Sequence, residues 1–309
     1  MTKFQDHCSN IVTTLTSALD SGNVQAWIKP WLSGPQGRSY PRSVSTGRPY
    51  SGLNSLMLAF SGYSNPWWLT FKQVKNLGGS VRKGEKATTV FFWKWLHKEE
   101  DGEVKRIPLF KTFNVFNIEQ CDVPAEELTK LEARLDRICG PVTGLSVEDA
   151  ITAAETVCLD WCNAEDVTVH DTGNQACYIP SQDEINMPKV EWFKDGHKGY
   201  AQTFAHECVH ATGAKSRLDR KLDGGFGSKD YAREELVAEI GSAMIMANTG
   251  TDLNEEQCVA YLKNWLDRCG EDATALNYGA TRAEKAAAMI LGTTEEAATS
   301  EQKEEVVTA

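Results

Sequence analysis

No run of 18 or more consecutive apolar residues occurs in the 309-residue sequence, whereas a helix that crosses a membrane needs about 20. The first residues, MTKFQDHCSNIVTTL, also lack the basic segment, apolar core and small-residue cleavage site of a secretory signal. From these two absences we expect a cytoplasmic protein with no membrane partner. The hydrophobic fraction of 41% and the charged fraction of 24% are ordinary for a globular chain.

No two cysteines have the C-x-x-C spacing that marks cysteine-based zinc sites and redox motifs. The nine cysteines are scattered, and their number is odd. Disulfide frameworks belong mainly to secreted proteins. We therefore expect reduced thiols, and no structural zinc ion held by cysteine.

The net charge is −11, but the two parts of the chain carry opposite excesses of charge. Residues 1–121 hold 15 Lys and Arg against 8 Asp and Glu, a balance of +7. Residues 122–309 hold 17 against 35, a balance of −18. The overall acidity therefore does not exclude nucleic-acid binding, because the basic part can contact phosphate groups.

The change of charge divides the chain into two domains. The helices and strands expected in these domains predict an α+β protein. The expected parts are a small mixed α/β domain (1–121), a linker helix (122–140), a mostly helical domain (141–292) and a disordered acidic tail (293–309). In the first domain we expect helices over 4–20, 53–60 and 67–79, then strands with a hairpin at Asp101-Gly102. In the second we expect a helix over 146–163, strands within 166–171 and 174–188, and helices around 199–213, 228–248, 254–269 and 281–291. A small sheet followed mainly by helices is typical of a zincin-like domain.

The segment FAHECVHATG, residues 204–213, carries the H-E-x-x-H pattern of zinc metallopeptidases. On a helix, His210 falls about 40° from His206, so both imidazoles share one face and can bind one ion. Glu207 falls about 100° from His206, beside that ion, where a general base acts. The opposite side is apolar and suits a core. The pattern predicts one divalent metal ion, Zn2+, bound by His206 and His210, with Glu207 as the catalytic residue of a gluzincin-like peptidase.

A carboxylate from YAREELVAEIG, residues 231–241, is expected to complete the metal site. Glu235 is the predicted third ligand. Glu239, one turn later, is predicted to hydrogen-bond a ligating histidine. Glu234 points about 100° away from Glu235 and is interpreted as a solvated charge, although Glu234 and Glu239 remain open as alternative ligands. An acidic helix with surface ion pairs is the other interpretation of this segment.

Tyrosines near the expected cleft are the candidates for stabilising an oxyanion. Tyr178, in the segment NQACYIPSQDEINMP, is the first choice, with a core tyrosine as the equal alternative. Tyr200 and Tyr231 are further candidates for the same role. His170 and His197 lack the spacing of metal ligands, and we expect them to be ordinary polar residues.

Six of the nine tryptophans lie in residues 1–121, interleaved with Lys and Arg. Single-stranded DNA is bound by aromatic side chains that stack on bases and by basic side chains that follow the phosphates. An aromatic core beneath a solvated basic surface explains the same composition, so the pattern alone leaves both interpretations open. The candidate DNA-binding residues are Trp27, Lys29, Trp31, Arg48, Tyr50, Asn54, Trp67, Trp68, Lys72, Lys75, Arg82, Lys83 and Lys86.

Several of these segments resemble one family, the ArdC-type antirestriction proteins of plasmids and phages. WIKPW, TGRPYSGLN, WWLTFKQVKNLGGSVRKGEKATTVFFW and FNVFNIEQ are similar to its N-terminal single-stranded-DNA-binding domain. DEINMP, HECVHATGAKSRLDR and YAREELVAEIG are similar to its zincin-like metallopeptidase domain. The resemblance covers nearly the whole chain except the linker and the tail.

The resemblance implies a protein that binds single-stranded DNA and protects incoming DNA from host restriction. It also implies a metal ion held by His206, His210 and a glutamate of EELVAE. It does not identify the protein substrate, for which host restriction or defence components are candidates. Two alternatives stay open: a DNA-binding protector whose metal site is only structural, and a toxin-like effector metallopeptidase.

Overall fold

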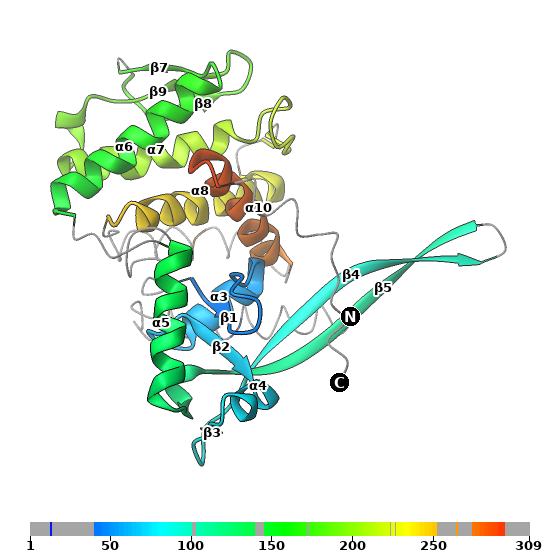
Figure 1. Cartoon of the computed structure of the whole chain (residues 1–309). Coiled ribbons are helices and arrows are strands. Elements are labelled where there is room, and N and C mark those ends of the chain that lie inside the picture. The colour runs from blue at the N-terminus through cyan, green and yellow to red at the C-terminus, as the bar shows by residue number, and fades with distance from the viewer. Residues whose placement is uncertain are drawn as a thin grey trace. The chain divides into compact units, whose positions relative to one another are not determined.

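The computed structural model describes residues 40–100, 103–139, 145–171, 173–222, 224–225, 227–251 and 274–293, together with residues 13 and 264. The chain divides into two units, Met1–Thr143 and Gly144–Ala309, whose elements are labelled in Figure 1. The α+β class is confirmed, with a strand-containing first part and a mostly helical second part. The helices expected over 4–20 and 254–269, and residues 294–309 of the tail, lie outside the described residues.

The first unit is built on a four-stranded sheet in the order β1-β2-β5-β4. Its strands are β1 (Arg42–Ser43), β2 (Trp67–Thr70), β4 (Thr88–Glu100) and β5 (Glu103–Asn117). β1 runs parallel to β2, whereas the other neighbours are antiparallel. β4 and β5 form a long hairpin in which Glu100 pairs with Glu103, and the turn predicted at Asp101-Gly102 lies outside the described residues. The remaining elements are α3 (Gly52–Phe60), α4 (Phe71–Asn76), β3 (Ser80–Val81), η2 (Ile118–Gln120), β6 (Cys121–Asp122) and α5 (Ala125–Cys139).

The helix predicted over residues 67–79 is wrong in its first part, which forms strand β2. Trp67, Trp68 and Leu69 are at most 1% exposed, because the two faces of the sheet bury alternate side chains of this strand. Helix α4 begins after Thr70, whose side chain forms a capping box with Gln73. Aromatic residues fit the pleated surface of a sheet well, and the run of apolar residues resembles both a buried strand and a helix.

Two clusters of buried side chains hold the first unit together, one on each side of β2. Trp67 and Leu69 belong to the first cluster, whereas Trp68 packs with Leu58, Val90 and Val115 in the second. Helix α5 adds further side chains to the first cluster: Leu131, Leu135 and Cys139. The helix expected between the two domains therefore also contributes to the core of the first unit.

The described part of the second unit contains a small three-stranded sheet and four longer helices. The sheet has the order β7-β9-β8, with β7 parallel and β8 antiparallel to β9, so that β8 is an edge strand. Its elements are α6 (Val147–Ala164), β7 (Thr168–His170), β8 (Cys177–Ile179), β9 (Glu184–Asn186), η3 (Val190–Trp192), α7 (Gly196–Ala211), α8 (Lys229–Asn248) and α10 (Ala275–Ile290). No described helix is long and apolar enough to cross a membrane. The cysteines in the described part of the chain form no disulfide.

Helices α7 and α8 pack closely where Gly241 faces Val209. A Cβ atom added to Gly241 would lie 2.8 Å from Val209 Cγ2, which is too close for an unstrained contact. Ser228 caps α8 by accepting a hydrogen bond from the backbone N–H of Tyr231. The cap and the close contact together fix which residues of α8 face α7.

We predict that Gly241→Ala destabilises the protein, although an Ala in a helix is normally more stable than a Gly by about 0.5–1 kcal/mol. The added methyl group would force α7 and α8 apart and lower the free energy of unfolding by roughly 1–3 kcal/mol. Urea unfolding followed by circular dichroism measures this change. Gly199→Ala on α7 is the control, because its Cβ would meet Phe193 Cβ at an ordinary 3.4 Å. Equal stability of the two variants would contradict the prediction.

Candidate metal centre and nucleic-acid surface

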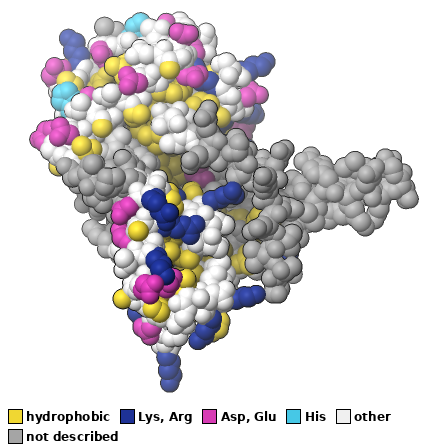
Figure 2. All heavy atoms as spheres, in the orientation of Figure 1, with side chains coloured by type: hydrophobic (Ala, Val, Ile, Leu, Met, Phe, Trp, Pro, Cys, Tyr) yellow, Lys and Arg dark blue, Asp and Glu magenta, His cyan; other side chains and the backbone are white. Residues whose placement is uncertain are grey.

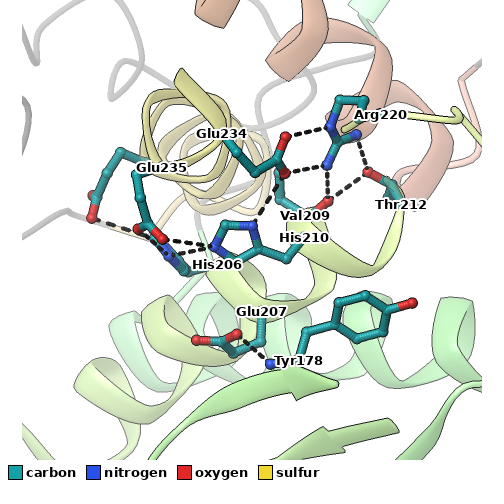
Figure 3. Close-up of polar contacts among 10 residues, drawn as sticks. Tyr178, His206, Glu207, Val209, His210, Thr212, Arg220, Glu234 and Glu235 are labelled. Atoms are coloured by element: carbon teal, nitrogen blue, oxygen red, sulfur yellow. Dashed lines mark hydrogen bonds and ion pairs between the residues drawn. The ribbon is translucent and has the colours of Figure 1, made fainter. Parts of the chain in front are cut away.

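Helices α7 and α8 bring His206, His210 and Glu235 together. One ligand atom from each lies within 4.8 Å of the others. The two histidine Nε2 atoms are 3.1 Å apart. The Glu235 carboxylate oxygens lie 3.5 Å from His206 Nε2 and 3.7 Å from His210 Nε2. Figure 3 shows both imidazoles reaching from α7 towards the carboxylates of α8.

Glu234 does not point into solvent, contrary to the prediction of a solvated charge. It is 6% exposed, and its Oε1 lies 3.1 Å from His210 Nδ1. Arg220 donates hydrogen bonds to both of its carboxylate oxygens, at 2.9 and 2.8 Å. Burial alone would raise the pKa of Glu234, but hydrogen bonds from His210 and Arg220 lower it. The helical projection failed because it was measured from Glu235 alone, whereas Glu234 contacts the other ring nitrogen of His210.

Glu239 lies beside the other histidine, with Oε1 3.6 Å from His206 Nδ1. This is the neighbour that the sequence predicted for Glu239, at an ion-pair distance slightly longer than a good hydrogen bond. Burial raises the pKa of Glu239. Both histidines therefore have a carboxylate of α8 next to Nδ1, while their Nε2 atoms face Glu235.

The acceptor-rich arrangement of these three residues fits a bound cation. His210 Nδ1 lies at hydrogen-bond distance from Glu234 Oε1, and with the ring proton on Nδ1 the Nε2 atom carries a lone pair. That lone pair faces His206 Nε2 and a carboxylate oxygen of Glu235, two further potential acceptors. Only a proton or a metal ion between them relieves the repulsion. Two imidazoles and one carboxylate are a donor set suited to a divalent transition metal with an open coordination position.

Glu207 is 7% exposed and lies next to this group on α7. Its Oε2 accepts a hydrogen bond of 2.8 Å from the backbone N–H of Tyr178, on edge strand β8. Figure 3 shows the Glu207 carboxylate below the histidines, on the side of the sheet. A cavity of about 350 Å³ borders it, lined by residues that include Gln175, Cys177, His206, Glu207, His210, Lys221 and Tyr231.

Tyr178 lines this cavity, but its hydroxyl group is hydrogen-bonded to Asp183 and not to the metal-ligand cluster, so its oxyanion role stays a prediction. It donates a hydrogen bond of 2.8 Å to Asp183 Oδ1, and Arg217 bonds the same carboxylate. Burial and the hydrogen bond to Asp183 raise the pKa of Tyr178 to about 12. What Tyr178 offers the site is its backbone N–H, which a search of the sequence for functional side chains does not reveal.

The other two tyrosine candidates differ in position. Tyr200 donates its hydroxyl proton to Asp171 at 2.7 Å and is not among the residues that line the cavity. Tyr231 lines the cavity and its hydroxyl group hydrogen-bonds Glu235. Burial alone would raise the pKa of Glu235, but the hydrogen bond from His206, the charges of both histidines and the hydrogen bond from Tyr231 lower it. Tyr231 is therefore the tyrosine whose hydroxyl group lies nearest to the chemistry.

Several predicted DNA-binding residues of the first unit have structural roles instead. Trp67 and Trp68 are 1% exposed and cannot stack on bases. The Asn54 side chain is bonded to the backbone N–H and carbonyl group of Phe91. Tyr50 packs against the second core cluster. Trp27, Lys29 and Trp31 lie outside the described residues.

Five predicted basic residues are exposed: Arg48, Lys72, Lys75, Lys83 and Lys86. Arg82 is exposed too, although its side chain bonds the carbonyl group of Glu119. Figure 2 shows Lys and Arg side chains, in dark blue, over the surface of the first unit. The predicted basic residues that the structure describes are therefore at the surface, whereas Trp67 and Trp68 are in the core.

Exposed phenylalanines on the β4–β5 hairpin were missed by the sequence reasoning. Phe92 and Phe113 are each 46% exposed. Phe92 pairs directly with Lys111, and Val90 pairs with Phe113, which puts Phe92, Lys111 and Phe113 on one face of the hairpin. We call these three residues the aromatic face. The period-2 spacing of Lys111 and Phe113 within KTF, and the position of Phe92 in FFW, could have indicated this face. The prediction of stacking residues instead rested on the tryptophans.

Two family models match the chain. Residues 5–116 match the N-terminal domain of anti-restriction factor ArdC. Residues 158–282 match a zincin-like metallopeptidase domain, which includes the H-E-x-x-H segment and all of α8.

Curated relatives include two proteins named DNA primase TraC from Escherichia coli, 31% and 32% identical over 86% and 84% of the chain. The chain spans only 25% and 18% of the length of these primases. An uncharacterized protein, y4eC, of Sinorhizobium fredii is 32% identical, with 91% of the chain and 90% of that protein covered.

Solved structures that resemble this one include the antirestriction protein ArdC from plasmid R388 in a metal-free and an Mn(II)-bound form. Each is 31% identical, with a TM-score of 0.67. The matches cover 95% and 93% of this chain and 98% of each of those chains. The zincin-like domain, the Mn(II)-bound relative and the three converging ligands support a site for one divalent metal ion.

We predict that the affinity for a divalent metal rises with pH up to about pH 9. Burial alone would lower the pKa of His206, but hydrogen bonding to Glu235 and the charges of Glu239 and Glu207 raise it to about 9. A metal ion binds only the neutral imidazole, so below that pKa binding must release a proton. Titrations with Zn2+ and Mn2+ should show about a tenfold gain per pH unit, with about one proton released at neutral pH. Calorimetry in buffers of different ionisation enthalpy measures the number of protons released. A metal affinity that does not change between pH 7 and pH 9 would contradict the prediction.

Proposed function

Because the chain belongs to the ArdC family of antirestriction proteins, we propose that it binds single-stranded DNA and protects incoming DNA from restriction in the cytoplasm of a host cell. We further propose that its second unit is a zinc-dependent peptidase. Its substrate would then be a protein, with components of host restriction or defence as candidates. The DNA arrives by plasmid transfer or phage infection.

The observation that carries the catalytic part is the position of Glu207 beside the three converging ligands. His206, His210 and Glu235 would hold the metal ion, which would act as a Lewis acid that polarises a carbonyl group and lowers the pKa of water. Glu207 is kept at the edge of the same cavity by the backbone N–H of Tyr178. From there its free oxygen can take a proton from an attacking water molecule and pass it to a leaving amine.

Two further groups of this cavity assist in orientation. The hydrogen bond from Tyr231 fixes the Glu235 carboxylate. The side chain of Tyr178 is fixed by Asp183 and Arg217, and this anchors the strand whose backbone orients Glu207. A rigid base next to a rigid set of ligands is what hydrolysis requires, since misplacement by about 1 Å costs about 10²-fold in rate.

The DNA-binding part rests on the first unit. Its aromatic face carries two exposed rings with a lysine between them on the same strand face. Rings at such diagonal positions, about 7–8 Å apart along the backbone, are spaced for successive unpaired bases. The exposed lysines supply contacts to phosphate groups. The similarity of part of two DNA primases to this chain is consistent with a role in DNA transactions.

We predict that Glu207→Gln abolishes proteolysis while metal and DNA binding persist. The amide cannot accept the proton, so the chemical step should slow by about 10²–10⁴-fold. A restriction-protection assay compares the full-length wild type with this variant, with metal content and oligonucleotide binding measured in parallel. Loss of protection supports the catalytic proposal. Full protection by the variant would instead favour a DNA-binding protector with a structural metal site.

We predict that Phe92→Ala and Phe113→Ala weaken binding of single-stranded oligonucleotides by about 1–3 kcal/mol for each lost stack. Both rings are exposed, so the unfolding temperature should stay near that of the wild type. Fluorescence anisotropy measures the affinity at several salt concentrations, and added salt should weaken binding. Trp192→Ala is the matched control, because Trp192 is an exposed aromatic residue (60%) of the second unit. Unchanged affinity in the two Phe variants would remove the aromatic face from the proposal. Absence of all binding at low salt would favour the toxin-like alternative.

A further inference from the structure

Arg220 is a buried arginine whose side chain is only 3% exposed. It donates hydrogen bonds to both oxygens of Glu234. The same guanidinium group donates to Thr212 Oγ1 at 2.8 Å and to the Val209 carbonyl oxygen at 2.6 Å. Arg220 therefore connects the C-terminal end of α7 to the N-terminal part of α8.

The chain of contacts continues from Arg220 through Glu234 to His210. Glu234 Oε1 receives the hydrogen bond from Arg220 Nη2 and lies 3.1 Å from His210 Nδ1. Figure 3 shows the three side chains in sequence, with the far side of the imidazole facing Glu235. Because Arg220 balances its charge, Glu234 can stay ionised although it is buried. An ionised carboxylate only accepts hydrogen bonds, so His210 must place its proton on Nδ1.

We propose that Arg220 and Glu234 are a positioning pair that fixes the ring orientation and the tautomer of His210. The pair holds Nε2 as a lone-pair donor aimed at the metal position. This inference rests on the proposed function, because it assumes that His210 binds a divalent metal ion. It adds two residues that act through His210 and touch neither the metal ion nor the substrate.

The neighbouring histidine offers an internal comparison. Glu239 lies next to His206 in the way that Glu234 lies next to His210, but at the longer distance of 3.6 Å. Within the described part of the chain, Glu239 forms its ion pair with His206 and has no arginine beside it. The two histidines therefore differ in their neighbours. Glu234, beside His210, is hydrogen-bonded by an arginine, whereas Glu239, beside His206, has no such arginine among the described residues. Glu239→Gln should weaken metal binding less than the loss of Glu234 does.

A buried ion pair is also expected to influence stability, and this must be separated from positioning. Removal of one partner leaves an unpaired buried charge and destabilises a protein strongly, whereas replacement of both partners by apolar residues of similar size is often neutral. The double variant Arg220→Met with Glu234→Met removes both charges together. We expect this variant to keep the fold while it loses the hydrogen bond to His210.

The experiment measures the affinity of the full chain for Zn2+ and Mn2+ in the wild type, Glu234→Gln, Glu239→Gln and the double variant. Loss of such an outer hydrogen bond typically costs 10–100-fold in metal affinity. We expect the full loss in the double variant, despite an unfolding temperature near that of the metal-free wild type. Glu234→Gln keeps an oxygen that can accept from Nδ1, and we expect a smaller loss. A folded double variant with wild-type affinity would overturn the proposal.

A second measurement needs no metal ion. The sequence has six histidines, few enough for their ring nitrogens to be resolved by NMR of a ¹⁵N-histidine-labelled protein. We expect the metal-free wild type to show His210 with a proton on Nδ1, and the double variant to show a mixture or the other tautomer. An unchanged His210 spectrum in the double variant would overturn the proposal. If the wild type bound no divalent metal, the proposed function would fail, while this spectrum would still decide whether the pair sets the tautomer.

Discussion

The site depends on the close packing of α7 against α8 at Val209 and Gly241. Only a glycine allows the two helices to approach so closely. This approach brings the carboxylates of α8 within reach of the imidazoles of α7, which are presented one turn apart. A wider spacing would leave Glu235 too far from both histidines to complete a single binding point. The same packing of α7 against α8 therefore determines both the core and the geometry of the metal site.

The same approach gathers an unusual concentration of negative charge. Four glutamates surround the two histidines, and three of them are less than 9% exposed: Glu207, Glu234 and Glu235. Buried carboxylates stay ionised only where cations or several donors oppose them. Arg220 neutralises Glu234, and the N–H of Tyr178 satisfies one oxygen of Glu207. Glu235 faces two imidazoles, where a divalent cation completes the balance of charge. The glutamates and histidines therefore favour a positive ion at the position between His206, His210 and Glu235.

The sequence predicted the parts of this site that follow from helical periodicity. The shared face of His206 and His210 and the choice of Glu235 needed only the H-E-x-x-H pattern and the stripe on the next helix. The neighbour relation of Glu239 followed from the same stripe. Periodicity does not determine how two helices cross. The contact of Glu234 with His210 and the role of Arg220 therefore could not be predicted from the sequence. The backbone role of Tyr178 depends on strand order, which periodicity does not determine. The α+β class was predictable, but the apolar run at Trp67 carried no signal to distinguish strand from helix.

The first unit shows why composition alone is a weak guide to a binding surface. A tryptophan is valuable both in a core, where it buries a large area, and on a surface, where it stacks on bases. In β2, Trp67, Trp68 and Leu69 are all buried, since the strand lies between two other strands of the sheet. The hairpin of β4 and β5 has the opposite situation, because β4 is at the edge of the sheet order. Side chains there emerge from the core, and Phe92 and Phe113 become exposed beside Lys111. Exposed aromatic rings on a β-hairpin lower solubility and add little to stability, and the proposed stacking of single-stranded DNA bases would account for their exposure.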